Sequence, residues 1–477
     1  MLAALLSCSD SVKVSRTLDE MPVIFPDYNG VVIPPNIAPL NFALNDQDAG
    51  SCAVFSFGGQ QFEVKGEKGG FVIPPSKWKK LLESAAGNSI QVTVQVKQGN
   101  EWVAYSPFTI QVAAEKIDSY LAYRLIDPGY ELWNKMGIYQ RDLESYTQTP
   151  IIENKMSGNN CVNCHSFCMQ NPDKMLFHMR ETFPGTILVD GDKIEKLNTK
   201  TRETISSLVY PSWHPSGKYV AFSVNTTKQA FHLNDKNRVE VYDEASDVVV
   251  YDVEKHEIVT ASTIFSKDAF ETFPTFSPDG KTLYFCTAEA RPIPQEYSEV
   301  KYNLCSISFD PATRTFGTQV DTLYNAKSGG MSASFPRVSP DGRYLLYTLS
   351  GYGNFSIWHK DADLYMTDLQ TGTSRSLAEV NSDDVESYHS WSSNSRWFVF
   401  SSRRIDGLYT RPYIAYVGED GKVGKPFLLP QKDVGFYPSF MKSFNIPEFI
   451  TGKVKVQGRA LAIKAKEDKG TDVRFAK

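Results

Sequence analysis

Apolar and polar residues alternate along short segments from about residue 205 onward, and the same pattern recurs every 50 to 60 residues or so. Each copy starts with an aromatic residue, Pro, a polar residue and an apolar residue, and continues into a tight turn. In the complete copies this turn is Ser-Pro-Asp-Gly, where Pro fixes φ and Gly accepts a positive φ. The copies begin Tyr210-Pro211-Ser212-Trp213, Phe273-Pro274-Thr275-Phe276 and Phe335-Pro336-Arg337-Val338, with degenerate copies Tyr388-His389-Ser390-Trp391 and Tyr437-Pro438-Ser439-Phe440.

A second pair of strands closes each copy, as in residues 247–252 and 363–368. Four strands in a unit of about 50 residues predict the blades of a β-propeller. The five copies, together with strands expected over 186–197, predict six blades. The copies depart from the pattern at a long insert over 226–245 and at the eroded fourth turn.

Residues 31–112, ahead of the repeats, also alternate between apolar and polar. Residues 89–96 predict a strand, Gln98-Gly99-Asn100 a turn and residues 102–112 the returning strand. We therefore expect a small β-sandwich before the propeller.

Composition agrees with an all-β protein that has more than one core. The chain has 477 residues, of which 13% are aromatic, and contains 31 Gly and 26 Pro. Its 50 basic and 55 acidic residues give a net charge of −5, which offers no electrostatic basis for nucleic-acid binding. No segment has the 18 or so uninterrupted apolar residues that would predict a transmembrane helix.

The first residues read Met1-Leu2-Ala3-Ala4-Leu5-Leu6-Ser7-Cys8. A short apolar run that ends in a small residue and Cys resembles the lipobox of bacterial lipoproteins. The resemblance implies that residues 1–7 are the remnant of a signal peptide, that Cys8 is lipidated and that residues 8–28 are a tether. It also implies a lipid-anchored protein of the cell envelope, on the outer membrane and facing the periplasm or the surface. The alternative is a mildly hydrophobic N-terminus, since the basic part of a signal peptide is missing.

The motif Cys161-Val162-Asn163-Cys164-His165 has the spacing of covalent c-type heme attachment. The two thiols would form thioethers to the vinyl groups, and His165 would reach the iron from the proximal side. Random matches in a chain of this composition are expected on the order of 10⁻³ times. A thioredoxin-like dithiol and a zinc site are the rival interpretations, but the flanks show no βαβ pattern and only Cys168 lies nearby.

The distal heme ligand is less sharply indicated. His178 follows His165 by 13 residues and would give a bis-imidazole iron of low potential. Met175, Met179 and Met136 are the alternatives, and a Met ligand would raise the potential. An open or water-ligated iron is the remaining alternative.

The repeat signature resembles that of the TolB-like propeller family over about residues 205–445. A lipid-linked sandwich, the sequence CVNCHSF and such blades together resemble heme-motif propeller lipoproteins of Bacteroidetes. This implies a β-sandwich over residues 29–115, a short helical heme-binding segment over 116–182 and a six-bladed propeller over 183–477.

We therefore expect a membrane-anchored c-type heme protein that transfers single electrons, with the propeller as docking platform for a redox partner or another envelope protein. The alternative is a TolB-like binding or scaffold protein in which one covalent heme is structural. A peroxidase or reductase would require an open distal site. No G-x-S-x-G, H-E-x-x-H or P-loop motif occurs, and Asp383, Asp384 and Glu386 form either a cation site or a solvated loop.

The seven cysteines can be assigned in part. Cys8 is assigned to lipid and the motif pair to heme, which leaves Cys52, Cys168, Cys286 and Cys305. Cys286 and Cys305 lie in successive strands and could form a disulfide if the register allows. Cys52 and Cys168 are expected to be free thiols, with a bridge between them as the alternative.

Overall fold

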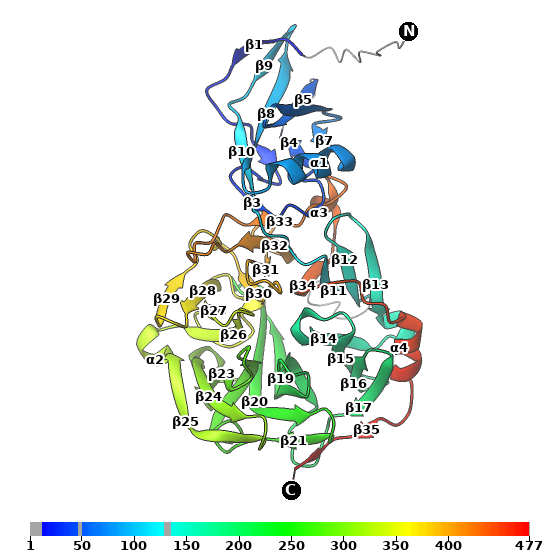
Figure 1. Ribbon diagram of the computed structural model, residues 1–477. Helices are drawn as coiled ribbons and strands as arrows, with labels where there is room; N and C mark the ends of the chain where they lie inside the picture. Colours follow the sequence, from blue (N-terminus) through cyan, green and yellow to red (C-terminus); the bar gives the residue numbers. More distant parts are fainter. Residues whose placement is uncertain (1–11, 46–49, 128–134, 477) are drawn as a thin grey trace. The chain divides into compact units, whose positions relative to one another are not determined.

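The computed structural model describes residues 12–45, 50–127 and 135–476, which form two compact units (Figure 1). Unit 1 comprises Met1–Lys116 and Pro430–Phe440, and unit 2 comprises Ile117–Leu429 and Met441–Lys477. Within the described residues, no helix is both long and apolar enough to cross a membrane.

Unit 1 consists of two sheets and a helix. The three-stranded sheet packs on the larger one through Phe42, whose ring centroid lies 6.4 Å from that of Phe55 and 6.2 Å from that of Phe108. The larger sheet contains β1 (Val14–Thr17), β3 (Val32–Ile33), β5 (Ser51–Phe57), β6 (Gln60–Lys65), β8 (Ser89–Gln98), β9 (Glu101–Ala104) and β10 (Phe108–Val112). The smaller sheet contains β2 (Ile24–Phe25), β4 (Phe42–Leu44) and β7 (Gly70–Phe71). The sandwich expected from the alternation is therefore present.

Helix α1 (Pro75–Ala85) is an addition that the alternation did not predict. Its buried residues Trp78, Leu81, Leu82 and Ala85 follow the i, i+3, i+4, i+7 spacing of one helix face. Trp78 packs edge-on against Phe55, so the helix covers the core of the larger sheet.

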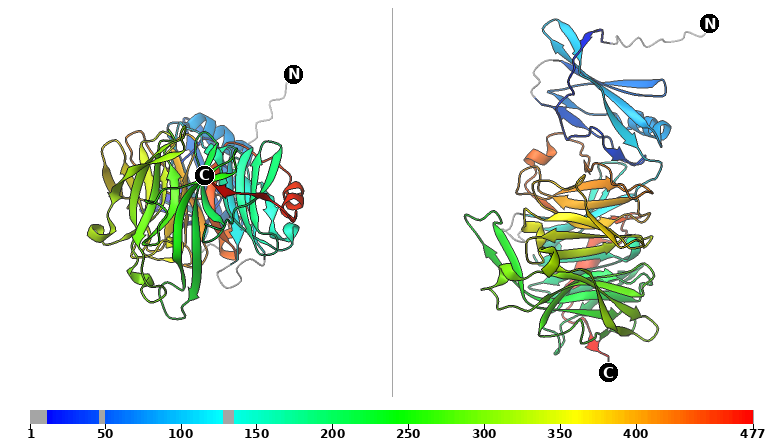
Figure 2. Two further views of the ribbon diagram at one scale, coloured as in Figure 1. Left: turned by 90° about the horizontal axis from the view of Figure 1, so that it is seen from below. Right: turned by 90° about the vertical axis from the view of Figure 1, so that its left-hand side faces the viewer.

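Unit 2 is an all-β propeller, as the repeats predicted. Its described residues form six sheets that follow one another in chain order around a ring in Figure 1, and Figure 2 shows the ring from two further sides. Five sheets take four consecutive strands each, and the C-terminal strands β35 (Thr471–Asp472) and β36 (Arg474–Phe475) extend two of them. The remaining sheet combines three strands from the start of unit 2 with β34 (Ser443–Ile450) from near its end, and this pairing closes the ring.

The first sheet contains β11 (Tyr120–Ile126), β12 (Gly137–Asp142), β13 (Gln148–Glu153) and β34; the second contains β14 (Cys161–Phe167), β15 (Lys174–Arg180), β16 (Gly185–Asp190) and β17 (Lys193–Asn198). The third and fourth contain β18 (Leu208–Trp213), β19 (Tyr219–Phe231), β20 (Val239–Asp252) and β21 (Glu257–Val259), then β22 (Ala269–Phe276), β23 (Thr282–Glu289), β24 (Asn303–Asp310) and β25 (Thr315–Tyr324). The last two contain β26 (Ser332–Val338), β27 (Tyr344–Ser350), β28 (Asp363–Asp368) and β29 (Thr373–Ser376), then β30 (Glu386–Trp391), β31 (Trp397–Ser402), β32 (Arg411–Tyr416) and β33 (Phe427–Leu428). Short helices α2 (Ala326–Gly329) and α4 (Gly458–Ala465) complete the unit.

The heme-motif residues are not helical. The expected helical segment is wrong, because Cys161–Phe167 form strand β14, which pairs with β15 in the register Cys161↔Arg180, Val162↔Met179 and Asn163↔His178. Residues 116–182 thus contribute strands β11 to β15 to the first two sheets of unit 2 instead of forming a segment of their own.

The repeat's turn is stabilised by its own side chains. In the second copy the Ser277 hydroxyl donates to Asp279 Oδ1, while the Lys281 and Thr282 amides donate to Asp279 Oδ1 and Ser277 Oγ. The eroded fourth copy keeps all three bonds, with Ser392 and Asn394 in place of Ser and Asp. Its turn is therefore eroded in sequence but not in structure.

Gly280→Ala should destabilise unit 2 far more than Gly191→Ala. Both glycines have positive φ, at +72° and +60°, so each Ala pays a backbone cost of about 1–2 kcal/mol. A Cβ at Gly280 would also lie 2.1 Å from His214 Nε2, whereas one at Gly191 meets no atom within 4 Å. We expect losses of about 3 and 1 kcal/mol in urea denaturation, and equal losses would contradict the packing of His214 on this turn.

Candidate functional site

The innermost strand of each sheet carries a β-bulge at the same place in the repeat. At each bulge, two residues of the innermost strand lie opposite one residue of its neighbour. The bulges lie between Asn163 and Ser166, Val209 and Ser212, Thr272 and Thr275, Ser334 and Arg337, and Ser387 and Ser390; in β34 the two bulge residues are Ile446 and Pro447. The first bulge residue has φ between +49° and +52° at Tyr210, Phe273, Phe335, Tyr388 and Ile446. Since positive φ is uncommon outside glycine, this shared value identifies the equivalent position in each sheet.

This alignment corrects the fifth copy of the repeat. The β34 copy begins at Ile446-Pro447-Glu448-Phe449, and not at Tyr437. Tyr437 lies in helix α3 (Phe436–Ser439) of unit 1, where the Asn41 amide donates to the carbonyls of Gln431 and Lys432. Tyr437-Pro438 thus matches the aromatic-Pro start of the repeat in sequence only, because it does not lie in a propeller strand.

The alignment also gives the heme motif a place in the repeat. Residues 164–167 in β14 occupy the same four backbone positions as residues 210–213 in β18, because the bulge falls at 164 and 165. The side chain of Cys164 is outside the described residues. By position, His165 therefore corresponds to the Pro of four other copies and to His389 of the β30 copy, and Ser166 corresponds to their third residue.

The bulges surround a cavity of about 150 Å³ to which the innermost strands of all six described sheets contribute. The first-position rings of Tyr210, Phe273, Phe335 and Tyr388 line it and contact one another in sequence, with centroids 5.0, 4.0 and 4.9 Å apart. The third-position residues also line it, and we call them the polar ring: Ser166, Ser212, Thr275, Arg337, Ser390 and Glu448. The site thus has an aromatic wall and a polar one.

His165 lines this cavity, and among the described residues it has no hydrogen-bond partner. Its side chain is 3% exposed, and neither ring nitrogen makes a hydrogen bond to the described part of the chain. Burial, and then the charge of Arg124, lower its pKa to about 3, with a small opposing effect of the Ile446 backbone. The imidazole is therefore neutral at physiological pH.

Arg337 and Glu448 are the charged members of the polar ring. Burial raises the pKa of Glu448 to about 8, although the Phe167 amide donates to it at 3.0 Å and Arg337 opposes the rise. The Arg337 guanidinium donates to the Pro336 carbonyl at 2.8 Å, and among the described residues it forms no ion pair. The raised pKa of Glu448 weakens the negative charge that faces Arg337 in the cavity.

The other predicted heme ligands lie elsewhere. His178 does not line the cavity; its Nδ1 lies 3.1 Å from Thr186 Oγ1, and burial lowers its pKa to about 3. Met136, Met175 and Met179 pack with Cys161 in one buried apolar cluster. Leu176, which shares the sheet face of His178, packs in a different cluster with Leu208 and Trp213. The structure thus places the candidate distal ligands on both faces of the β14–β17 sheet, and Cys8 lies outside the described residues.

These residues do not fit a heme in this structure. The cavity next to His165 has about 150 Å³, whereas pockets for drug-sized ligands, which are smaller than heme, need roughly 300 Å³ or more. Cys161 is 9% exposed and is held in the ladder with Arg180. No group of three or more His, Cys, Asp or Glu that could hold a metal ion occurs in the described part of the chain.

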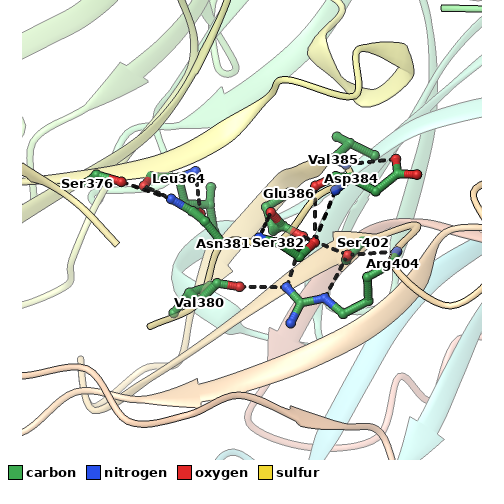
Figure 3. A network of polar contacts seen from close by, with 10 residues as sticks. All are labelled: Leu364, Ser376, Val380, Asn381, Ser382, Asp384, Val385, Glu386, Ser402 and Arg404. Carbon is green, nitrogen blue, oxygen red and sulfur yellow. Dashed lines mark hydrogen bonds and ion pairs between the residues drawn. The ribbon is translucent and has the colours of Figure 1, made fainter. Parts of the chain in front are cut away.

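The acidic stretch around Glu386 is not a cation site in the structure (Figure 3). Glu386 is fully buried, and its Oε1 accepts from Ser382 Oγ, Ser402 Oγ and Arg404 Nη2 at 2.7–2.9 Å. The Ser382 amide donates to its Oε2. Because donors already occupy both oxygens, this carboxylate stabilises the loop before β30.

The sequence analysis missed a second buried acidic group in the long insert. The insert extends hairpin β19–β20, and Asp243 Oδ2 there accepts from the amides of Asn225 and Asn354 at 2.7 and 2.6 Å. Burial raises the pKa of Asp243 to about 7. Glu240 similarly accepts from Tyr352 and lies 3.1 Å from His359 Nε2. The acidic side chains thus fasten the hairpin to residues 352–359, which only the tertiary structure reveals.

The register does not allow the disulfide between Cys286 and Cys305 that the sequence left open. Cys286 pairs with Leu304 and Cys305 with Phe285, so the two side chains point to opposite faces of the sheet. Accordingly, they pack in different apolar clusters. Cys52, Cys168, Cys286 and Cys305 are all buried free thiols.

No protein-family model matches the chain, and no curated protein does. Among solved structures, it is similar to the β-propeller domain of the Trilobed protease from Pyrococcus furiosus, with 11% identity, TM-score 0.34 and coverage of 71% of this chain and 81% of that one. A DUF4784 family protein from Bacteroides caccae matches with 6% identity, TM-score 0.31 and coverage of 76% and 95%. Dipeptidyl peptidase 4 from Porphyromonas gingivalis matches with 11% identity, TM-score 0.31 and coverage of 68% and 53%. Similarity at this level carries no inference about activity.

Asp243→Asn should remove part of the pH dependence of stability. The folded pKa of about 7 lies above the usual 3.8, so the folded chain keeps a proton that the unfolded chain releases. Stability therefore falls as pH rises between these values. We expect the variant to gain about 2 kcal/mol relative to the natural chain between pH 5 and pH 8 in urea denaturation. The exposed carboxylate variant Asp268→Asn is the control, and parallel pH profiles for Asp243→Asn and the natural chain would contradict this account.

Proposed function

We propose that this protein is a binding protein of the TolB-like propeller type, whose ligand site is the cavity enclosed by the bulges. The observation that carries the proposal is the imidazole of His165, which makes no hydrogen bond to any described residue. Leaving a buried polar group without a hydrogen bond costs about 1–3 kcal/mol. A small polar ligand that bonds to this ring would recover that cost.

The form of the cavity supports the same proposal. Small ligands are bound in concave sites with mostly apolar walls and a few convergent polar groups. The aromatic wall supplies the first of these features, and His165 with the polar ring supplies the second. Both are held on innermost strands, which are rigid elements with fixed side-chain directions.

Electron transfer through a covalent heme is the weaker candidate, because the motif residues do not fit the group. Attachment would require β14 to leave its ladder with β15. Our proposal of a lipid-anchored envelope protein rests on Cys8 alone and is independent of the heme. A protein that docks on the propeller remains part of the proposal as the source or receiver of the ligand.

Expression with a c-type heme maturation system tests the heme question directly. We expect the purified chain to give no pyridine hemochrome spectrum. After reduction, its mass should equal that of the polypeptide without heme. A heme c cytochrome expressed in the same cells serves as the positive control. A hemochrome that disappears in the double variant Cys161→Ser/Cys164→Ser would contradict the binding-protein proposal in its present form.

Thermal unfolding with a panel of small molecules tests the cavity. The panel holds neutral sugars, carboxylic acids, amines, amino acids and short peptides at millimolar concentration. We expect at least one class to raise Tm of the natural chain and to have a much smaller effect on His165→Phe and Thr275→Met, which remove the free imidazole and narrow the cavity. His256→Gln, outside the cavity, should respond like the natural chain. A panel that leaves Tm unchanged, or stabilises all four proteins equally, would overturn the proposal.

A further inference from the structure

We infer that the cavity binds a small molecule or chain end through a carboxylate, and that the Arg337 guanidinium is its principal contact. This inference rests on the proposed function, since it names the ligand class for the same cavity. It follows from a departure of one residue from the repeat, from the charge in the cavity and from the donors around it.

Arg337 stands where the repeat has a small hydroxyl residue. The third position is Ser166, Ser212, Thr275 and Ser390 in four of the six described sheets. The fold therefore does not require a long basic side chain at this position. Arg337 is half-buried, and placing its guanidinium against the cavity has a desolvation cost that a bound anion would offset as its partner.

Nothing in the described part of the cavity supplies that partner. Toward the residues that the structure describes, the guanidinium donates one hydrogen bond, to the Pro336 carbonyl. Glu448, the carboxyl that lines the same cavity, already accepts from the Phe167 amide, and burial raises its pKa. His165 is neutral and His389, which also lines the cavity, has its pKa lowered to about 3 by burial and by Arg337. A bound anion would balance the charge.

The surrounding donors suit a carboxylate. Arg presents a planar fork that matches two carboxylate oxygens, which makes the pair both strong and directional. Ser212 Oγ donates to Thr275 Oγ1 at 3.3 Å, so the Thr275 hydroxyl keeps its proton for a further acceptor. The aromatic wall would cover an apolar part of the same ligand.

The size of the cavity limits the ligand. A dry cavity of about 150 Å³ in another protein holds one benzene molecule, and this cavity has about the same volume. A small organic acid with a ring or short chain would fit, and so would the terminal residue of a peptide that enters with its C-terminal carboxylate. Both sources share the carboxylate chemistry.

Matched acids and amides test the inference by calorimetric titration. We use benzoate against benzamide for the free acid, and acetyl-Gly-Phe against its C-terminal amide for the chain end. We expect an acid to bind at least tenfold more tightly than its amide. If acetyl-Gly-Phe binds more tightly than benzoate, the natural ligand is a peptide C-terminus. If benzoate binds more tightly, the natural ligand is a small free acid. Either result supports recognition of a carboxylate.

The repeat itself supplies the variant for this test. Arg337→Thr places at the third position of β26 the residue that β22 carries at the same position, so the strand should tolerate it. We expect this variant to lose at least tenfold in affinity for the acid and nothing for the amide. Arg291→Thr, on an exposed loop, is the matched control, and Glu448→Gln should bind the acid normally at pH 7.

The possible outcomes separate the two proposals. Equal binding of acid and amide, tighter binding of benzylamine than of benzoate, or full affinity in Arg337→Thr would overturn the carboxylate inference. In each of these cases a cavity-dependent rise in Tm with another class of the panel would still support the binding protein. Loss of every ligand effect would overturn both.

Discussion

The propeller depends on one backbone constraint, the bulge at the head of each innermost strand. Holding a residue with a side chain near φ +50° is unfavourable, and it persists only where the surrounding ladder determines it. Here it turns the first residue of four copies, Tyr210, Phe273, Phe335 and Tyr388, into a common aromatic cluster, and the third residue of each copy lines the cavity. The fold and the candidate site are therefore consequences of the same strained position.

This constraint explains which parts of the fold could be predicted from sequence. Aromatic-Pro pairs and Ser-Pro-Asp-Gly turns are visible because their residue types are demanded by local geometry, and they located the three complete copies. Ile446 fulfils the same backbone role without being aromatic, so its copy was placed at Tyr437 instead. Strands β11 to β13 were missed because their sheet is completed by β34, which pairs with β11 from more than 300 residues away in the chain.

The C-x-x-C-H motif shows that a rare local pattern must be weighed against the strand in which it lies. The low number of matches expected by chance was calculated for a chain in random order. These residues, however, lie at a defined position of the repeat. At that position each copy has two bulge residues, which have no partner of their own in the strand pairing, followed by a third residue that lines the cavity. In β14 these three residues are Cys164, His165 and Ser166. Motif spacing says nothing about the ladder partners that hold the segment extended, and those partners decide its chemistry.

The candidate site could be predicted only in part for a related reason. His165 was singled out as an iron ligand, and the structure keeps it in the site but gives its ring a different neighbourhood. Arg337 and Glu448 were overlooked because each looks ordinary in a charged chain, and they become informative only when the copies are aligned in space. Where four copies carry a small hydroxyl, two charged residues facing one cavity are the substitutions that packing does not explain. In a repeat protein, the function is therefore best sought where one copy departs from the rule that the others obey.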